Sequence, residues 1–179
     1  MQHLLGVFAL GSEAVADARV LYDVLKAEHT KAGHVVHGKV ETPAGCLGIT
    51  GLNDDYGVYS SCETGRVTAV AGECGVDGLV GARALAEIAG DHPDRLADVD
   101  GCFSVASFDP MSRRGWVGCD RMGFMQLYWK EHQGLLVFAS CGTYVARATA
   151  TPSVDGMTVV TMLAYGQPLG SRSMFAGVS

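Results

Sequence analysis

The sequence predicts an α+β domain in which sheets and helices pack in layers. Its clearest β-hairpin lies within residues 99–129, where an apolar run at 102–108 is followed by turn residues and a second apolar run at 116–119. Apolar strands are expected near both ends of the chain, with helical segments between them. This distribution favours layered sheets and helices over a helix bundle.

The N-terminal third should contain a strand, a helix and several short strands. The strand spans residues 4–10, and Ser12 is placed to cap the helix that follows. The apolar stripe of this helix consists of Val20, Leu21, Val24 and Leu25, and the helix should end near Gly33. Turn residues then separate short expected strands at residues 46–50, 58–61 and 67–71.

The remaining elements follow from apolar runs and their spacing. A second helix is expected at residues 79–89, rich in Ala and Leu, and a third at residues 156–164. Another strand should open at Leu127, and a buried strand should cover residues 135–140.

Composition and charge restrict the possible functions. The 179 residues suffice for one domain with a substantial core, and the net charge of −6 argues against binding to nucleic acid or to an anionic membrane. No apolar run approaches the roughly 18 to 20 residues of a membrane helix. The N-terminus has no basic start or small-residue cleavage site, so a cytoplasmic protein is expected. An apolar content of 48% predicts that some surface faces a partner.

The six cysteines are expected to be reduced, because none of them forms a Cys-x-x-Cys pair. Cys102, Cys119 and Cys141 fall in or beside apolar strands, where a free Cys behaves as a small hydrophobe. Disulfides remain the alternative.

A series of short motifs in the second half resembles a known family. The motifs are Asp100-Gly101, Asp109, Asp120-Arg121-x-Gly123, Leu127-Tyr128 and Phe138-Ala139-Ser140. In this order they resemble the N-terminal class II glutamine amidotransferase domain of asparagine synthetases, β-lactam synthetases and lasso-peptide cyclases. The first strand, around Leu4 to Phe8, and the tail at residues 154–178 are also similar to that domain. The resemblance implies an Ntn-hydrolase-like αββα fold over residues 1–179, with two antiparallel sheets sandwiched between helices and no synthetase domain.

Enzymes of this family hydrolyse glutamine with an N-terminal cysteine, whose thiol attacks the amide while the α-amine carries the proton. Counted from the start of the chain, Gln2 takes that position. Aligned on Gly6-Val7-Phe8, it falls on Leu5 instead. Neither side chain is a nucleophile or a base, so the sequence predicts a domain without glutaminase activity and without catalytic residues.

The pocket implied by the resemblance is also degenerate. The family's Asn-Gly-Glu segment corresponds to Ala71, Gly72 and Glu73, so the amide of the Asn is missing. Asp77 corresponds to the acidic residue that holds the substrate amine. The Arg that grips the substrate carboxylate has no match near residues 47–52.

Three other patterns are weighed and set aside. Residues 33–40 nearly spell a phosphate-binding loop, but Val40 cannot bind magnesium and no strand precedes the segment. His34 and His37 lie in an extended segment and should face opposite sides, so ordinary surface or hinge histidines are favoured over a metal site. For Asp120 and Arg121, a structural ion pair is favoured over a catalytic pair.

The sequence therefore predicts a non-catalytic domain, either excised or a stand-alone subunit, that supports an ATP-dependent, asparagine-synthetase-like amide ligase. ATP and magnesium are expected only on a partner synthetase domain, with no cofactor or metal in this chain. The expected partner is a synthetase domain or subunit, or a second copy of the chain. The alternative is an enzyme or small-molecule-binding protein that reuses the former glutamine pocket, with Glu73 and Asp77 as acid and base.

Overall fold

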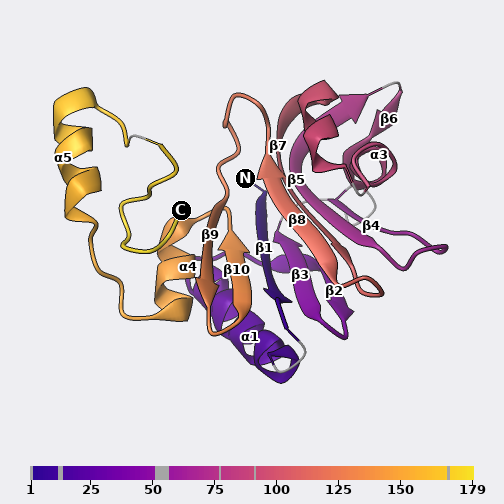
Figure 1. Ribbon diagram of the computed structural model, residues 1–179, viewed down its shortest axis with the longest axis horizontal. Helices are drawn as coiled ribbons and strands as arrows, with labels where there is room; N and C mark the ends of the chain where they lie inside the picture. The colour runs from indigo at the N-terminus through magenta and orange to yellow at the C-terminus, as the bar shows by residue number, and fades with distance from the viewer. Residues whose placement is uncertain (1, 12–13, 51–56, 77, 91, 169) are drawn as a thin grey trace.

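The fold is built on two antiparallel sheets (Figure 1). The computed structural model describes residues 2–11, 14–50, 57–76, 78–90, 92–168 and 170–179. One sheet has the strand order β2 (Val36–Thr42), β3 (Gly45–Thr50), β1 (His3–Ala9), β10 (Leu135–Ala139) and β9 (Tyr128–His132). The first strand of the chain is thus the centre of this sheet, paired with β3 on one side and β10 on the other.

The second sheet contains the predicted hairpin. Its order is β4 (Val58–Ser60), β5 (Val67–Val76), β7 (Asp100–Asp109) and β8 (Arg114–Cys119), and β6 (Leu79–Val80) pairs with β5. The helices are α1 (Val15–Lys31), α3 (Gly81–Ile88), α4 (Gly142–Thr149) and α5 (Gly156–Tyr165), with a 3-10 helix at Pro93–Asp98. The expectation of an α+β fold with two antiparallel sheets is confirmed.

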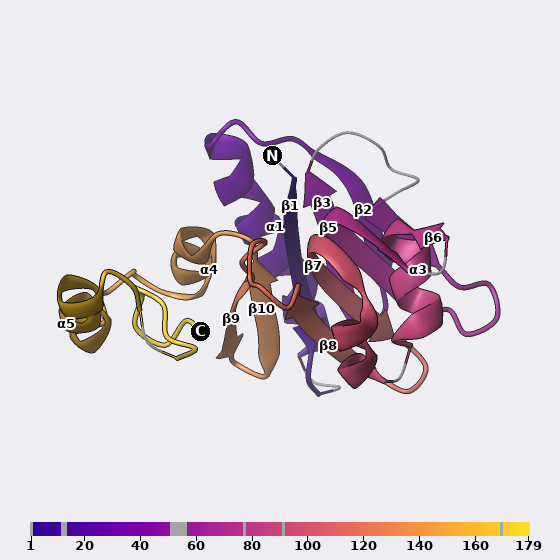
Figure 2. The same cartoon turned by 90° about the horizontal axis from the view of Figure 1, so that it is seen from above.

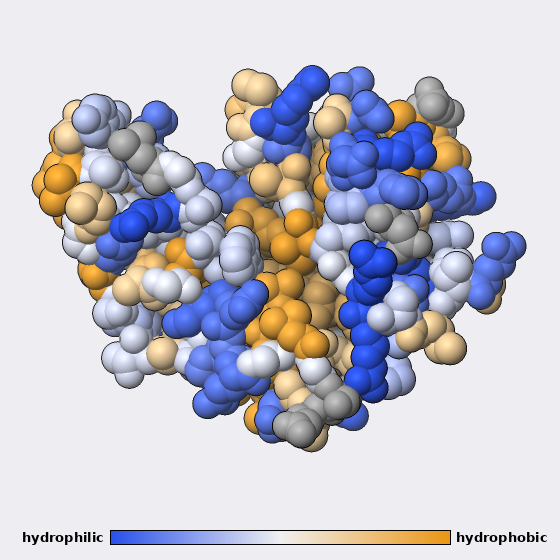
Figure 3. All heavy atoms as spheres, viewed as in Figure 1, coloured by the Kyte–Doolittle hydropathy of each residue, from blue (hydrophilic) through white to orange (hydrophobic). Residues whose placement is uncertain are grey.

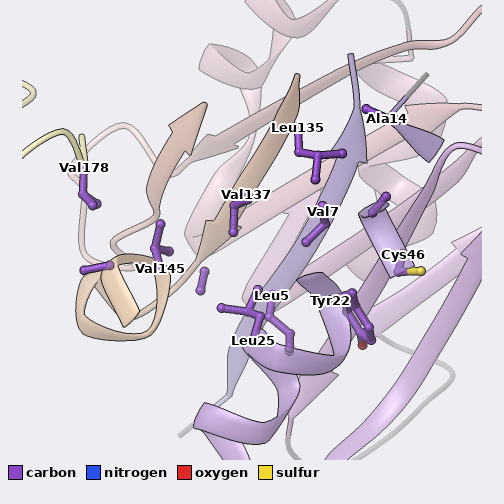
Figure 4. Close-up of a cluster of buried hydrophobic side chains, with 14 residues drawn as sticks. Leu5, Val7, Ala14, Tyr22, Leu25, Cys46, Leu135, Val137, Val145 and Val178 are labelled. Atoms are coloured by element: carbon purple, nitrogen blue, oxygen red, sulfur yellow. The ribbon is translucent and has the colours of Figure 1, made fainter. Parts of the chain in front are cut away.

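Alternation along β1 places two cores on opposite sides of the first sheet. Leu4 and Phe8 belong to a cluster between the sheets, together with residues of β3, β5 and β7. Leu5 and Val7 face the other way, into a cluster that includes Leu25 of α1 (Figure 4). A third cluster joins α3 to the outer face of the second sheet. Helices therefore cover both outer faces of the paired sheets.

The buried face of α1 differs from the expected stripe. Val20 and Val24 are 65% and 42% exposed. Leu25, a member of that stripe, is fully buried, and Leu21 packs partly buried against the same core. The side chains that pack inward recur every three or four residues, namely Ala18, Tyr22, Leu25 and His29. Sequence periodicity therefore located the helix and Leu25, but it was wrong for Val20 and Val24. The expected cap, Ser12, lies outside the described residues.

Two further expectations need correction. The segment predicted as one helix from residue 79 begins with the short strand β6, and α3 starts only at Gly81, where φ is +67°. All six cysteines are free, as expected, but Cys102 and Cys119 are exposed. Burial in β7 begins at Phe103, so Cys102 lies outside the core.

Helix α5 stands apart from the sheets and projects beyond α4 in both views (Figure 2). Asp155 caps α5 by accepting a hydrogen bond from the Met157 N–H at 3.0 Å. The end of the chain returns to β9, where Trp129 and Ser179 exchange backbone hydrogen bonds of 2.7 and 2.9 Å. Across the described residues, no helix is both long and apolar enough to cross a membrane.

Candidate functional site

The N-terminal end of β1 meets the second sheet at Gly72 of β5. The side-chain oxygen Oε1 of Gln2 accepts a hydrogen bond from the Gly72 N–H at 2.8 Å. Gln2 lies two residues before Leu4, so alternation directs it toward the second sheet. The structure therefore joins two residues that the sequence analysis singled out separately, although they are 70 positions apart.

Gly72 and Gly101 shape the second sheet beside this contact. Gly72 has a φ of +101°, and a Cβ atom there would lie 2.1 Å from the Cys102 carbonyl oxygen. Gly101 has a φ of +135°, and a Cβ atom there would lie 2.1 Å from the backbone carbonyl oxygen of Glu73. Both positions accept only glycine without a local shift of the backbone. The Asp100-Gly101 motif thus has a structural role, since it lets β7 approach β5 next to the Gln2 site.

Three hydroxyl groups hold the beginning of β1. The His3 N–H donates to Thr50 Oγ1 at 3.0 Å, and the Leu4 N–H donates to Ser140 Oγ at 2.9 Å. Ser104 Oγ of β7 lies 3.4 Å from Ser140 Oγ, which links the two sheets. Ser140, known from the sequence only as part of a motif, is therefore a fixed point of the site.

The other predicted pocket residues lie in different environments. Leu5 is fully buried beneath α1, away from Gly72, so only Gln2 occupies the position near the donor. Ala71 is buried between the sheets and offers no polar atom there. Glu73 is exposed. Asp77 lies outside the described residues, so a pairing with Glu73 stays a prediction.

One cavity opens beside Gln2, and a second adjoins it. The smaller has a volume of about 140 Å³ and is lined by Gln2, His3, Phe124, Met125, Gln126 and Ser140. A larger cavity of about 420 Å³ shares Gln126 and Ser140 with it and extends to the C-terminal segment at Arg172 and Phe175. The walls are mainly apolar, with few charged groups.

The corner after β8 is fixed by Asp120. Its carboxylate accepts hydrogen bonds from the N–H groups of Met122, Phe124 and Met125, at 3.1, 3.1 and 2.9 Å. Burial alone would raise the pKa of Asp120, but these hydrogen bonds bring it below its usual value. The partners that the structure gives the Asp120 carboxylate are these backbone N–H groups and not the exposed Arg121, so the corner is fixed without the favoured ion pair. Gly123 completes the turn with a φ of +68°.

The histidines are arranged differently from the expectation. His37 is exposed, but the ring of His34 packs against that of His3 with centroids 4.4 Å apart. His29, which the sequence analysis missed, is fully buried next to both. Its spacing of four residues from Leu25 places it on the same face of α1, and this spacing could have identified it as buried. In the part of the chain that the structure describes, no group of His, Cys, Asp or Glu is arranged to hold a metal ion.

The residues between 33 and 40 do not form a phosphate loop. They lead from α1 into β2, which is an edge strand of the first sheet, and no helix begins there. A phosphate site of that kind needs a strand before the loop and a helix after it. The structure supplies the reverse order.

The groups at the Gln2 site are able to form hydrogen bonds with a ligand. The Gly72 N–H is a donor suited to a carbonyl or an oxyanion, but the group opposite it is a carboxamide, which is neither a nucleophile nor a base. A scan against protein-family models and a search of curated proteins found no match for the chain.

Proposed function

We propose that this chain is a glutaminase-inactive, Ntn-hydrolase-like amidotransferase domain that supports an ATP-dependent ligase of the asparagine synthetase type. The Gln2–Gly72 hydrogen bond is the observation that carries the proposal. By the resemblance, an attacking thiol and an oxyanion donor would stand at these two positions. Here the Gly72 N–H donates to the carboxamide oxygen of Gln2, a residue of the same chain. In an active relative, we expect the amide of a substrate glutamine to accept this hydrogen bond.

The C-terminal segment supports the role of a partner domain. Apolar side chains of α5 are exposed, including Val160 at 60% and Leu163 at 84%, and no charged residue interrupts the helix. Apolar residues gather at this projecting tip (Figure 3). An apolar surface of this kind is typical of a protein–protein interface. The partner we propose is a synthetase domain, on the same polypeptide or in trans, or a second copy of the chain.

The cofactors of the ligase are assigned to that partner. A carboxylate-activating step with ATP and magnesium requires acidic ligands for the metal and donors for the phosphates. These groups would belong to the synthetase domain. The proposed location is the cytoplasm, where ATP-dependent ligases have their substrate.

The first test combines a glutaminase assay with capture of the partner. The purified chain should release no glutamate from glutamine, and bait carrying the chain should retain an ATP-dependent synthetase that shows substrate-dependent ATP–pyrophosphate exchange. Leu163→Lys should abolish this capture. Met111→Lys, at an equally exposed apolar residue in the β7–β8 turn, should leave it intact. Glutamate release by the wild type, or equal capture by both variants, would contradict the proposal.

A second candidate function is suggested by the cavity at Gln2 and the one that adjoins it. Together they offer mainly apolar walls with the carboxamides of Gln2 and Gln126 and the hydroxyl group of Ser140, which is typical of a site for a small organic molecule. A screen by thermal shift, repeated with Gln126→Ala, tests this reading. A ligand that stabilises the wild type and not the variant would favour it. The proposed acid and base, Glu73 and Asp77, would then be examined by substitution.

A further inference from the structure

Three imidazole rings meet beneath the N-terminal end of β1. His3 comes from β1, His29 from the last turn of α1, and His34 from the segment that leads into β2. The ring centroids are 4.4 Å apart for His3 and His34, 6.2 Å for His3 and His29, and 6.4 Å for His29 and His34. The cluster therefore connects three elements at the point where β1 begins.

The hydrogen bonds of the cluster are incomplete. His29 Nδ1 lies 3.0 Å from the Leu25 carbonyl oxygen, which can only accept, so this nitrogen carries the proton. His29 Nε2 is then a bare lone pair, and it is buried with no hydrogen-bond partner among the described residues. His3 Nδ1 is also buried with no hydrogen-bond partner among the described residues. Buried polar atoms left this way cost stability and call for a physical role.

The surroundings of the cluster disfavour positive charge. The ring of Tyr144 of α4 packs on His29 at 4.3 Å, and beyond it Glu28 and Arg147 pair with each other at 3.4 Å. Burial, together with the neighbouring His34, His29 and amino terminus, lowers the pKa of His3 from 6.5 to about 4. Burial also lowers the pKa of His29, against the opposing effect of the Leu25 carbonyl.

We propose that His3, His29 and His34 form an acid-sensitive latch that holds the start of β1 while His3 and His29 are neutral and releases it when these two rings take up protons. Two like charges on rings this close repel each other in a buried setting. His3 is bonded to Gln2 through the backbone, so release of β1 from α1 also withdraws the Gln2 carboxamide from Gly72. The latch thus controls access to the Gly72 donor, whether or not the chain serves a ligase.

The direction of the pH effect follows from these pKa values. The folded state binds fewer protons than the unfolded chain at any pH between 6.5 and about 4. The stabilising contribution is therefore complete above pH 6.5 and declines as the pH falls toward 4. For His3 alone, the unfolding equilibrium constant should rise by up to about tenfold between pH 7.5 and 5.5. Carboxylates contribute little in that interval, because they titrate at lower pH.

An NMR titration of the whole chain from pH 7.5 to below the His3 pKa of about 4 is the deciding experiment. The ring signals of His3 and His29 should titrate with midpoints below 6.5, and the Gly72 amide signal should shift in parallel. Midpoints at or above 6.5, or a Gly72 signal that does not move, would overturn the latch.

Urea denaturation of matched variants supplies the second readout. His34→Gln removes one ring of the cluster and should reduce the dependence of stability on pH, whereas His37→Gln, at the exposed neighbour on β2, should retain the wild-type dependence. Equal slopes in the two variants would contradict the proposal. So would stabilisation by added Zn²⁺ that His34→Gln abolishes, because the rings would then serve a metal ion.

Discussion

The helices α1 and α5 show how little apolar content says about burial. α1 carries charges throughout, yet Tyr22, Leu25 and His29 are completely buried against the first sheet. α5 has no charged residue, yet Thr158 is its only buried side chain among those described, and Leu163 is 84% exposed. The more apolar helix is the less covered one.

The cause of the difference is the position of each helix relative to the sheets. α1 follows directly after the central strand β1 and lies over it. One face of α1 therefore packs against the apolar side chains of β1 and its neighbours. α5 lies beyond α4 and has no extensive contact with another element of the described chain. A helix that is apolar on most faces is normally buried, so the surface of α5 is where we propose that a partner binds.

The strongest test of this contrast is Leu25→Ala. Removing a fully buried Leu side chain leaves a cavity between α1 and β1, and we expect a loss of about 2–5 kcal/mol in the free energy of unfolding. Urea denaturation followed by circular dichroism measures it. A loss below about 1 kcal/mol would mean that α1 packs loosely.

Gly72→Ala should have the next largest effect. The added Cβ atom would lie 2.1 Å from a backbone oxygen at a φ of +101°, so a loss of at least about 2 kcal/mol is expected. Gly156→Ala in α5 is the matched control, because no atom lies within 4 Å of its Cβ. The control should be neutral or stabilising by up to about 1 kcal/mol. Similar behaviour of the two variants would refute the strain assigned to Gly72.

Asp120→Asn should cost about 1–3 kcal/mol near pH 7, since an amide cannot accept from all three backbone N–H groups. The lowered pKa of Asp120 means that the wild type has this advantage above the unfolded value of 3.8 and loses it as the pH falls through the folded value. Urea titrations at pH 7 and in acid should show the gap closing. Asp155→Asn, at the partly buried cap of α5, should have a smaller effect. An equal loss of unfolding free energy in both variants would show that the corner at Asp120 is no more important to stability than the cap of α5.

Leu163→Ala should have the smallest effect on stability. In the isolated chain the free energy of unfolding should move by less than about 0.5 kcal/mol, because the side chain is in solvent. The same variant should weaken capture of a partner, which separates the two roles of apolar residues. A large loss of stability in the isolated chain would show that α5 is packed in solution.

Much of the fold was predictable from local patterns. The hairpin β7–β8, the strands β1, β3 and β10 and the helix α5 appear near the predicted positions, because their apolar runs and turn residues are unambiguous. Among the described elements, β2, the short β6, the 3-10 helix at Pro93–Asp98 and α4 were missed. β2 is an edge strand with mostly polar, exposed residues, and α4 is short, with Gly142 at its start.

The candidate site was predictable only in its components. Gln2 and Gly72 were each identified, but the hydrogen bond between them depends on how the two sheets stack. The cluster of His3, His29 and His34 was not identified, since the three residues belong to three elements. Asp120 was assigned to Arg121, its neighbour in sequence, whereas its carboxylate turns inward to backbone groups.

The sequence by itself indicates most of the strands and helices, because periodicity and turn chemistry act over a few residues. It also specifies that position 2 lacks a nucleophile, since that depends only on residue type. The choice of the buried face of α1, the exposure of α5 and the meeting of Gln2 with Gly72 arise from packing between distant segments. Those contacts are set by how the sheets stack and which surfaces they leave uncovered, which no local pattern of residues contains.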